Sequence, residues 1–338
     1  MKRILVLCGG QSAEHAISVR SCKNVLKAIN RDKYDVVVIG ISQAGQWTLM
    51  EEDTISTVID AQENSVEIRP GQQACFWSEG KSLGVFDVVF PVLHGPNGED
   101  GTIQGLLELL GIPYVGCHVL SSAACMDKDT SKRLLEAADI KVSRWILLSE
   151  SGQFPTFSEV QRELSDIVFV KPSNMGSSVG VHRATNQKEW EAAIEDAFNY
   201  DNRVLVEEEI IGRELECAVL GNNNPKATGV GEVNSGNFYS YEEKYEETSE
   251  AQLMIPAEVD SNELNQLRAT ALKAYKVLQC TGLARIDMFL TESSQVYVNE
   301  VNTMPGFTSI SMYPKLWEQE GLSYPELIDK LIELALEA

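Results

Sequence analysis

Near its C-terminus the chain reads Leu283-Ala-Arg-Ile-Asp-Met-Phe-Leu290 and, after the polar residues 291–295, Val296-Tyr-Val-Asn-Glu-Val-Asn302. Alternating apolar and polar residues on both sides of a polar turn predict a β-hairpin. If the turn is centred between residues 293 and 294, two pairs face each other across the hairpin: Asp287 with Glu300, and Arg285 with Asn302. Side chains alternate across a strand, so all four project from one face of the sheet.

Two carboxylates at facing positions repel each other, and a hard cation between them is one remedy. The oxygen ligands of Asp287, Glu300 and Asn302 suit Mg²⁺, which keeps part of its water shell and shares phosphate oxygens with a substrate. The same pattern is also compatible with a solvated polar face or with a salt bridge to Arg285. A bulge in either strand would change the register.

Composition places this hairpin in a soluble globular protein. The 338 residues suggest two or three domains, and the net charge of −22 argues against nucleic acid or an anionic membrane as a partner, although it allows a nucleotide substrate. No stretch approaches the ~20 apolar residues that span a bilayer, and the first apolar run is interpreted as a strand rather than a signal peptide. The seven scattered cysteines include no C-x-x-C pair, so we expect reduced, buried thiols and a cytoplasmic location.

The N-terminal third alternates strands with a helix. Apolar runs at 3–7, 34–41 and 85–93 and a helical pattern at 18–29 predict a parallel sheet. The segments that follow its strands, 9–15 and 94–101, are expected at the carboxyl edge, where the active residues of such sheets lie.

A second unit is predicted to start near residue 121. We expect one helical segment at 121–139, and further elements as follows: strands 145–148, 168–170, 203–207 and 214–220, and helices 188–198 and 261–278. The segment 234–255 is long for a structureless loop, and we interpret it as a lid that contains Lys244 and Tyr245.

Two segments of the second unit suggest nucleotide binding. Lys171 and Pro172 end a strand and lead into the small residues 173–180, whose backbone N–H groups can surround phosphate oxygens. This loop is not a Walker sequence, and an ordinary hairpin is the alternative. In 204–210 an apolar strand runs into three acids, which is typical either of an adenine and ribose pocket or of a solvated charge run.

Together these segments resemble the D-alanine-D-alanine ligase family of the ATP-grasp fold. The resemblance spans nearly the whole chain and keeps the motif order, on the following segments: Gly9-Gly-Gln-Ser-Ala-Glu-His15, His94-Gly-Pro-Asn-Gly-Glu-Asp-Gly101, Met126-Asp-Lys128, Lys171 to Gly180, Lys244-Tyr245, Arg285-Ile-Asp287 and Asn299 to Gly306.

The resemblance implies a mixed α/β and α+β chain, in which a Rossmann-like parallel-sheet domain precedes an ATP-grasp fold. The implied domains are 1–120, a central ATP-grasp subdomain at 121–208, and a C-terminal subdomain at 209–338 with the metal site and the lid. It also implies ATP-dependent joining of two D-alanine molecules through an acyl phosphate, with release of ADP and phosphate, for peptidoglycan precursor synthesis. A homodimer is expected by family likeness, and activation by K⁺ is left open.

The implied ATP-binding residues are Lys128, Lys171, Ser173, Ser177, Ser178, Glu207, Glu209, Ile210, Glu214 and Lys244. The two lysines Lys128 and Lys171 would hold phosphates, and the acids and Ile210 would bind adenosine. Two Mg²⁺ or Mn²⁺ ions would bind Asp287, Glu300 and Asn302. One departure is Glu208, which stands where some members have a lysine that contacts adenine.

The implied substrate residues come from all three units. Glu14, with Ser177 and Tyr245, would hold the ammonium group of the first D-alanine. His94 would lie near that substrate's carboxylate, unless it is a satisfied structural histidine. Ser311 and Met312, at a helix N-terminus, would bind the carboxylate of the second D-alanine. Arg285 and the N–H of Gly306 would stabilise the oxyanion.

Individual residues disfavour the rival functions. Ligases that form D-alanine-D-lactate or D-alanine-D-serine are disfavoured by Tyr245 and by Met312. An ATP-binding regulator without catalysis is disfavoured because the metal and phosphate residues are all present. A carboxylase or a purine-pathway ATP-grasp enzyme is disfavoured by Glu14 and by the segment 311–312.

Overall fold

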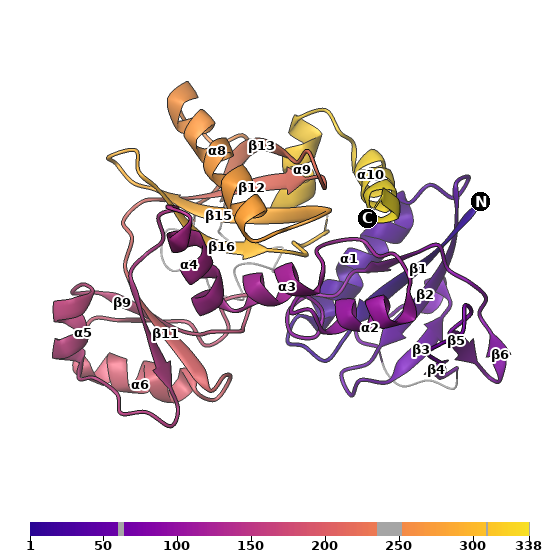
Figure 1. Cartoon of the computed structure of the whole chain (residues 1–338), viewed down its shortest axis with the longest axis horizontal. Helices are drawn as coiled ribbons and strands as arrows, with labels where there is room; N and C mark the ends of the chain where they lie inside the picture. Colours follow the sequence, from indigo (N-terminus) through magenta and orange to yellow (C-terminus); the bar gives the residue numbers. More distant parts are fainter. Residues whose placement is uncertain (60–63, 235–251, 309, 338) are drawn as a thin grey trace.

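Three main sheets and the helices that cover them make up the computed structural model, which describes residues 1–59, 64–234, 252–308 and 310–337. Figure 1 shows the N-terminal sheet on the right, the second sheet at the lower left and the third sheet above, with helices α3 and α4 between them.

The first sheet has the strand order β3-β2-β1-β7. Strand β1 (Lys2–Gly9) pairs in parallel with β2 (Tyr34–Ile41) and with β7 (Val88–Pro91), and β3 (Trp47–Met50) is antiparallel to β2. The predicted parallel sheet and helix α1 (His15–Ala28) are confirmed. Elements that the sequence did not predict follow: η1 (Glu52–Thr54), the small sheet of β4 (Val66–Ile68), β5 (Phe76–Ser78) and β6 (Lys81–Ser82), and α2 (Thr102–Leu110).

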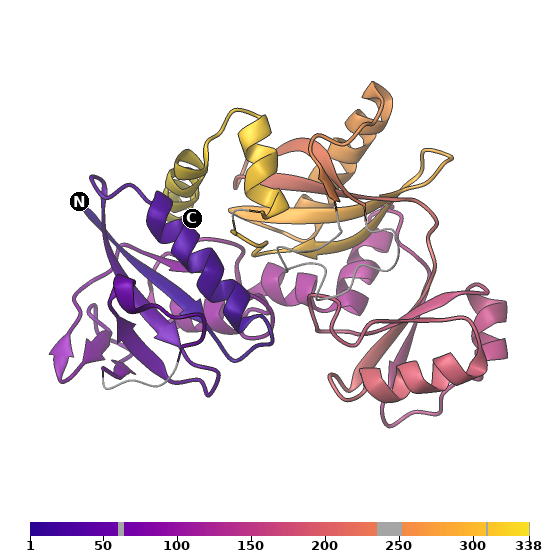
Figure 2. The same ribbon diagram turned by 180° about the vertical axis from the view of Figure 1, so that it is seen from behind.

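The last helix returns to this first sheet. Helix α10 (Tyr324–Glu337) contacts α1 and β7, and its Leu327 and Leu331 share one core with Ile4 of β1. Figure 2 shows α10 beside α1, and α10 also contacts α9, which precedes it in the chain. The C-terminal residues therefore complete the core of the N-terminal sheet.

The helical segment predicted at 121–139 is two helices, so the prediction of one helix is wrong. They are α3 (Val119–Met126) and α4 (Lys128–Ala137). The backbone of Asp127 between them is extended, and its side chain accepts a hydrogen bond from the N–H of Thr130 at 2.7 Å. This capping bond starts α4 at Lys128.

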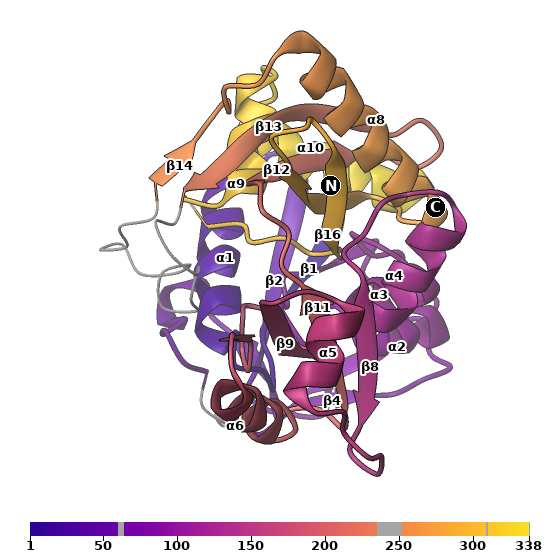
Figure 3. The ribbon, with the colours of Figure 1, turned by 90° about the vertical axis from the view of Figure 1, so that its left-hand side faces the viewer.

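The second sheet is antiparallel, with the order β10-β9-β11-β8. Its strands are β8 (Trp145–Ser149), β9 (Val168–Pro172), β10 (His182–Ala184) and β11 (Arg203–Glu208). Helices α5 (Phe157–Glu163) and α6 (Gln187–Ala197) cover one face, as Figure 3 shows. Val168 and Val170 of β9 belong to the core on that face, so Phe169 and Lys171 project from the other face.

The third sheet has the order β14-β13-β12-β15-β16, with antiparallel pairing throughout. Its strands are β12 (Arg213–Leu220), β13 (Lys226–Asn234), β14 (Gln252–Met254), β15 (Leu283–Leu290) and β16 (Val296–Asn302). Helix α8 (Ser261–Val277) packs against one face and α9 (Met312–Gln319) against the other. The predicted lid 234–255 begins in β13 and ends beyond β14, and its Lys244 and Tyr245 lie outside the described residues.

We expect Leu327→Ala to lower the free energy of unfolding by about 2–5 kcal/mol, because it leaves a cavity under a fully buried side chain. Urea unfolding followed by circular dichroism measures the change. The control is Leu109→Ala, whose parent side chain is 81% exposed, with an expected effect within about 0.5 kcal/mol. Equal midpoints for the two variants would show that α10 does not stabilise the first sheet.

Candidate functional site

The register of the β15–β16 hairpin brings the four predicted polar residues together. Asp287 pairs with Glu300, and Arg285 with Asn302, as predicted. Nearer the turn, however, Leu290 pairs with Val296, so the predicted turn centre is wrong by half a residue. The register shifts at a bulge beside Asp287, and this shift restores the predicted pairs.

Arg285 forms ion pairs within this cluster. Its Nε and Nη2 atoms donate to the two carboxylate oxygens of Asp287, both at 2.7 Å, and Nε lies 3.0 Å from Glu216 Oε2. The amide of Asn302 also donates to Asp287, at 3.0 Å. Burial alone would lower the pKa of Arg285, but the carboxylates of Asp287 and Glu216 raise it well above its ordinary value. The guanidinium therefore stays charged.

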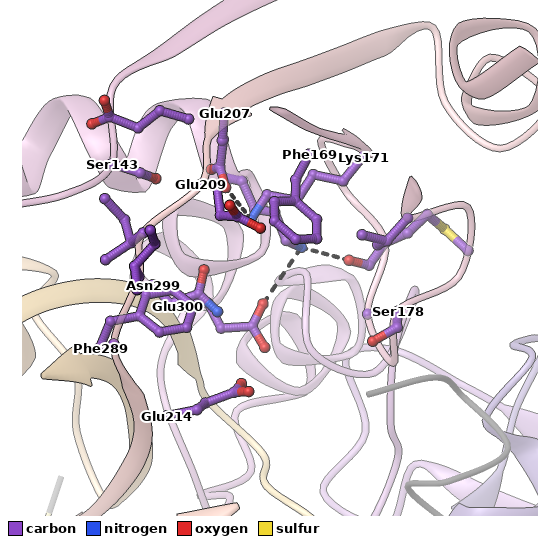
Figure 4. A pocket seen from close by; sticks show the side chains of 18 of the residues that line it. Ser143, Phe169, Lys171, Ser178, Glu207, Glu209, Glu214, Phe289, Asn299 and Glu300 are labelled. Carbon is purple, nitrogen blue, oxygen red and sulfur yellow. Dashed lines mark hydrogen bonds and ion pairs between the residues drawn. The ribbon is translucent and has the colours of Figure 1, made fainter. Parts of the chain in front are cut away.

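A cavity of about 410 Å³ lies between the second and third sheets. Figure 4 shows Phe169, Lys171 and Glu207 from the second sheet and Glu214, Phe289 and Glu300 from the third. Lys128, at the start of α4, reaches between them: its Nζ donates to the carbonyl of Met175 at 2.5 Å and lies 3.9 Å from Glu300 Oε2. The cavity thus combines apolar rings with charges of both signs.

Most of the predicted ATP-binding residues line this cavity: Lys128, Lys171, Ser177, Ser178, Glu207, Glu209, Ile210 and Glu214. Ser173 lies outside its lining and is fully buried, where its N–H donates to the carbonyl of Arg203 and its hydroxyl to Asp127. Of the predicted metal ligands, Glu300 lines the cavity, whereas Asp287 and Asn302 are not part of its lining and are joined to each other by a hydrogen bond.

The small-residue loop connects the cavity to the first sheet. Ser177 and Ser178 have φ values of 52° and 59°, and two turns, Gly176 to Val179 and Ser178 to Val181, close the loop. The hydroxyl of Ser177 donates to the carboxylate of Glu14, which follows β1 and is 6% exposed. The predicted Glu14–Ser177 contact is therefore present.

The loops that follow β1 and β7 lie at one edge of the sheet, as predicted. The hydroxyl of Ser12 donates to the carbonyl of His94 at 2.8 Å. Gly95 has a φ of +72°, and a Cβ atom there would lie 2.4 Å from Glu14 Oε2. Only glycine leaves room for the Glu14 carboxylate at this position.

His94 has partners for both ring nitrogens. Nδ1 lies 3.0 Å from the carbonyl of Met304, and Nε2 lies 3.0 Å from Ser21 Oγ. Burial lowers the pKa of His94, so the ring is neutral, with Nδ1 donating to the carbonyl and Nε2 accepting from the hydroxyl. His94 thus has a structural role, and its contact with a substrate carboxylate stays a prediction.

Glu99 lies in the segment 94–101, and the sequence predicted no role for it. Its two oxygens accept from the N–H groups of Gly95 at 2.7 Å and Met304 at 3.1 Å. Burial and the nearby charge of Glu14 raise the pKa of Glu99 to about 8. Glu99 and His94 therefore tie the loop after β7 to the segment after β16.

The predicted second-substrate residues lie where α9 begins. Ser311 is the N-cap, and its Oγ accepts from the N–H of Thr308 at 2.9 Å. A Cβ atom at Gly306 would lie 2.8 Å from this Oγ, so Gly306 and Ser311 are neighbours. Met312 is 4% exposed and packs so close to Gly231 that a Cβ there would meet its sulfur at 2.2 Å.

Sequence reasoning missed several residues around the cavity. Phe169 and Phe289 line it, and alternation from Lys171 and Asp287 would have placed both there. Glu208 also lines it and accepts from the Arg144 N–H and Nε atoms. Lys132, one helical turn after Lys128, lies 2.9 Å from Glu207 Oε1, a spacing that could have indicated it.

Two lysines therefore flank the Glu207 carboxylate, because Lys171 Nζ lies 2.5 Å from Oε2. Burial would raise the pKa of Glu207, but Lys132 and Lys171 hold it below its ordinary value. Within the described residues, no three His, Cys, Asp or Glu side chains form a metal cluster. The predicted metal site consists of two carboxylates and an amide.

Comparisons with known proteins match both halves of the chain. The family description "D-ala D-ala ligase N-terminus" covers residues 3–117, and "D-ala D-ala ligase C-terminus" covers 134–333. A D-alanine–D-alanine ligase of Proteus mirabilis is 47% identical over an alignment of 348 positions, which covers 99% of this chain and 95% of that protein. In the part of the chain that the structure describes, none of the helices combines the length and apolar character needed to cross a membrane.

Two solved structures extend the likeness. The VanG D-Ala:D-Ser ligase of Enterococcus faecalis is 39% identical with a TM-score of 0.89, and 99% of each chain is covered. A D-alanine–D-alanine ligase of Bacillus anthracis complexed with ATP is 28% identical with a TM-score of 0.77, over 100% of this chain and 98% of that one. The predicted fold class is confirmed, and the chain belongs to the D-alanine–D-alanine ligase family.

Proposed function

We propose that this protein joins two D-alanine molecules into a dipeptide and converts ATP to ADP and phosphate, as a step of peptidoglycan precursor synthesis. The observation that carries the proposal is the contact between Ser177 and Glu14. Ser177 lines the cavity between the second and third sheets, and Glu14 belongs to the first sheet. One loop thus connects the cavity to an acid that can hold an amino group.

The cavity is the ATP site of this proposal. Phe169 and Phe289 offer apolar rings for a base, and Lys128 and Lys171 offer charge for phosphates. The likeness to the ATP complex from Bacillus anthracis supports this assignment.

The donor set fits a hard divalent ion. Glu300 lines the cavity beside Lys128, Asp287 faces it across the hairpin, and Asn302 follows it two residues later on β16. The amide nitrogen of Asn302 donates to Asp287, and its carbonyl oxygen is the atom that would bind an ion. Bound Mg²⁺ or Mn²⁺ would offset charge on the transferring phosphoryl group. Two ions, and K⁺ as an activator, stay predictions.

In the first step the carboxylate of one D-alanine attacks the γ-phosphorus of ATP. An O–P bond forms, the bond to the β-phosphate oxygen breaks, and ADP leaves. Glu14 holds the ammonium group of this substrate, and Ser177 fixes the orientation of Glu14. Lys128 and Lys171 offset the negative charge that spreads over the phosphoryl oxygens.

In the second step the amine of the other D-alanine attacks the acyl-phosphate carbonyl. A C–N bond forms, the C–O bond to the phosphate breaks, and the phosphate leaves with the proton that the nitrogen loses. Charge develops on the carbonyl oxygen, and Arg285 and the N–H of Gly306 stabilise it. Ser311 and Met312 bind the carboxylate of the second substrate at the start of α9. Lys244 and Tyr245, which the sequence assigns to the closing lid, lie outside the described residues.

Three further expectations belong to this proposal. Each main sheet takes its strands from one of the units 1–120, 121–208 and 209–338, which supports those domain bounds. A homodimer and a cytoplasmic location stay predictions that follow from family likeness and from the reduced cysteines.

We expect the purified protein to make D-alanyl-D-alanine from ATP, Mg²⁺ and D-alanine, with one ADP released per dipeptide. Mass spectrometry measures the product and a coupled assay measures ADP. ATP hydrolysis that is equally fast without D-alanine would contradict the proposal.

A D-serine-using ligase is the second candidate, because a VanG D-Ala:D-Ser ligase is among the similar structures. The same incubation with equal D-alanine and D-serine separates the two. Our proposal requires D-alanyl-D-alanine as the main product, and a predominance of D-alanyl-D-serine would reassign the second substrate.

Arg285→Lys should lower kcat by about 10²–10³-fold, the usual cost of losing an oxyanion donor. Lysine keeps a positive charge beside Asp287 and Glu216, but it loses the planar fork that donates to both oxygens of Asp287. ATP affinity, measured by calorimetry, should change little. A variant that turns over like the parent would remove Arg285 from the mechanism.

Glu300→Gln should raise the Mg²⁺ concentration for half-maximal activity by at least about 10-fold, because the amide is a poorer ligand. Electron paramagnetic resonance with Mn²⁺ and ADP should show the same loss of metal affinity without any turnover. The control is Glu292→Gln, an exposed acid in the turn of the same hairpin. Identical Mn²⁺ titrations for the two variants would exclude Glu300 as a ligand.

A further inference from the structure

Lys132 lies just behind the wall of the cavity. Its side chain is 1% exposed, and its Nζ donates to the Ser143 carbonyl at 3.1 Å and to the Ser143 hydroxyl at 2.7 Å. Ser143 lines the cavity, whereas Lys132 does not. A ligand in the cavity therefore does not reach Lys132 directly.

Lys132 and Lys171 share one carboxylate. Lys132 Nζ lies 2.9 Å from Glu207 Oε1, and Lys171 Nζ lies 2.5 Å from Oε2. All three side chains are at least nine-tenths buried. Burial lowers the pKa of Lys132, whereas the nearby carboxylate of Glu207 raises it, so Glu207 favours the charged form of this lysine. One lysine is enough to balance Glu207, which leaves one positive charge for a ligand.

The two lysines differ in what they can reach. Lys171 lines the cavity on β9 and faces Lys128 and Glu300 across it. Lys132 is fixed by Ser143 and stacks over the ring of Trp145, with Nζ 5.4 Å from the ring centroid. If Lys132 were absent, any movement of Lys171 towards a phosphate would leave Glu207 buried without a counter-charge, which is strongly unfavourable.

We propose that Lys132 is a fixed counter-ion of Glu207 that frees Lys171 to contact the phosphates of ATP. Lys132 is thus a positioning residue that acts through Glu207 and Lys171. The inference rests on the proposed ATP site. The proposed role of Lys132 concerns only the binding of the phosphates. Adenosine has no phosphate, so the affinity of each variant for adenosine serves as its internal reference.

The test compares the affinities of the protein for ATP with Mg²⁺ and for adenosine, measured by calorimetry. Lys132→Gln keeps a hydrogen-bond donor towards Ser143 and Glu207 but removes the charge. Its preference for ATP over adenosine should fall by about 10²-fold, because Lys171 stays on Glu207. Lys132→Arg keeps the charge and should keep the preference. The control is Lys141→Gln, an exposed lysine that contacts Gln295.

Glu207→Gln provides the second arm, because an uncharged residue no longer retains Lys171. The double variant Lys132→Gln with Glu207→Gln should therefore prefer ATP as strongly as Glu207→Gln alone. If Glu207 itself contacts adenosine, its substitution weakens the binding of ATP and of adenosine equally. This effect cancels in the ratio of the two affinities. The double variant removes both partners of a buried pair, so it tests the inference even if Lys132→Gln alone does not fold.

The possible outcomes distinguish a failure of the proposed ATP site from a failure of the inference about Lys132. A parent protein that binds ATP no better than adenosine would disprove the proposed ATP site, and this inference with it. A parent that prefers ATP, together with an unchanged preference in Lys132→Gln, would disprove the inference alone. If the double variant also fails to prefer ATP over adenosine as strongly as Glu207→Gln does, the inference is overturned. Lys132 would then act on the phosphates without Glu207.

Discussion

The site depends on one extra residue in β16. Strand pairing shifts between Asp287 and Met288, so that Asp287 faces Glu300 although Met288 faces Val298. As a result Val298 and Val301, three residues apart, both pack in the core beneath α8. Side chains alternate with a period of two, so without the bulge either Val298 or Val301 would be on the wrong face. Each buried valine stabilises the fold by about 1.5–3 kcal/mol, and this burial therefore fixes the register of the polar residues.

Alternation on two sheets then produces the cavity. Val168 and Val170 pack beneath α5 and α6, which directs Phe169 and Lys171 away from them. Ile286 and Met288 pack beneath α8, which directs Asp287 and Phe289 away from it. The two outward faces meet around the cavity. Their buried charges have oppositely charged neighbours, as in Lys171 with Glu207 and Arg285 with Asp287, because an unpaired buried charge is costly. A ligand with phosphates can exchange partners with these pairs, whereas an apolar ligand would leave them unchanged.

Elements whose residue pattern lies within one short segment could be predicted from the sequence. Strand 34–41 was predicted with its observed bounds, and the facing pairs of the hairpin were right because an error at the turn and an unpredicted bulge offset each other. Helix α10 could not be assigned to the first sheet, since its partner Ile4 lies more than 300 residues earlier in the chain. The role of His94 was equally hidden, because both partners of its ring come from other segments.

The cores show which contacts unite the three parts of the site. One core joins the first sheet to the third, through residues such as Phe90 and Phe307, whose rings pack edge to face at 6.1 Å. The second sheet has a core of its own, built from residues between Leu148 and Val206. The contacts of this part of the chain with Glu14 and Glu300 are polar: Ser177 donates a hydrogen bond to Glu14, and Lys128 of α4 approaches Glu300. Separating the second sheet from the others therefore costs polar contacts and, among the described residues, no shared apolar core. This is the energetic condition for the proposed ATP site, which must open to exchange its nucleotide and close to exclude water.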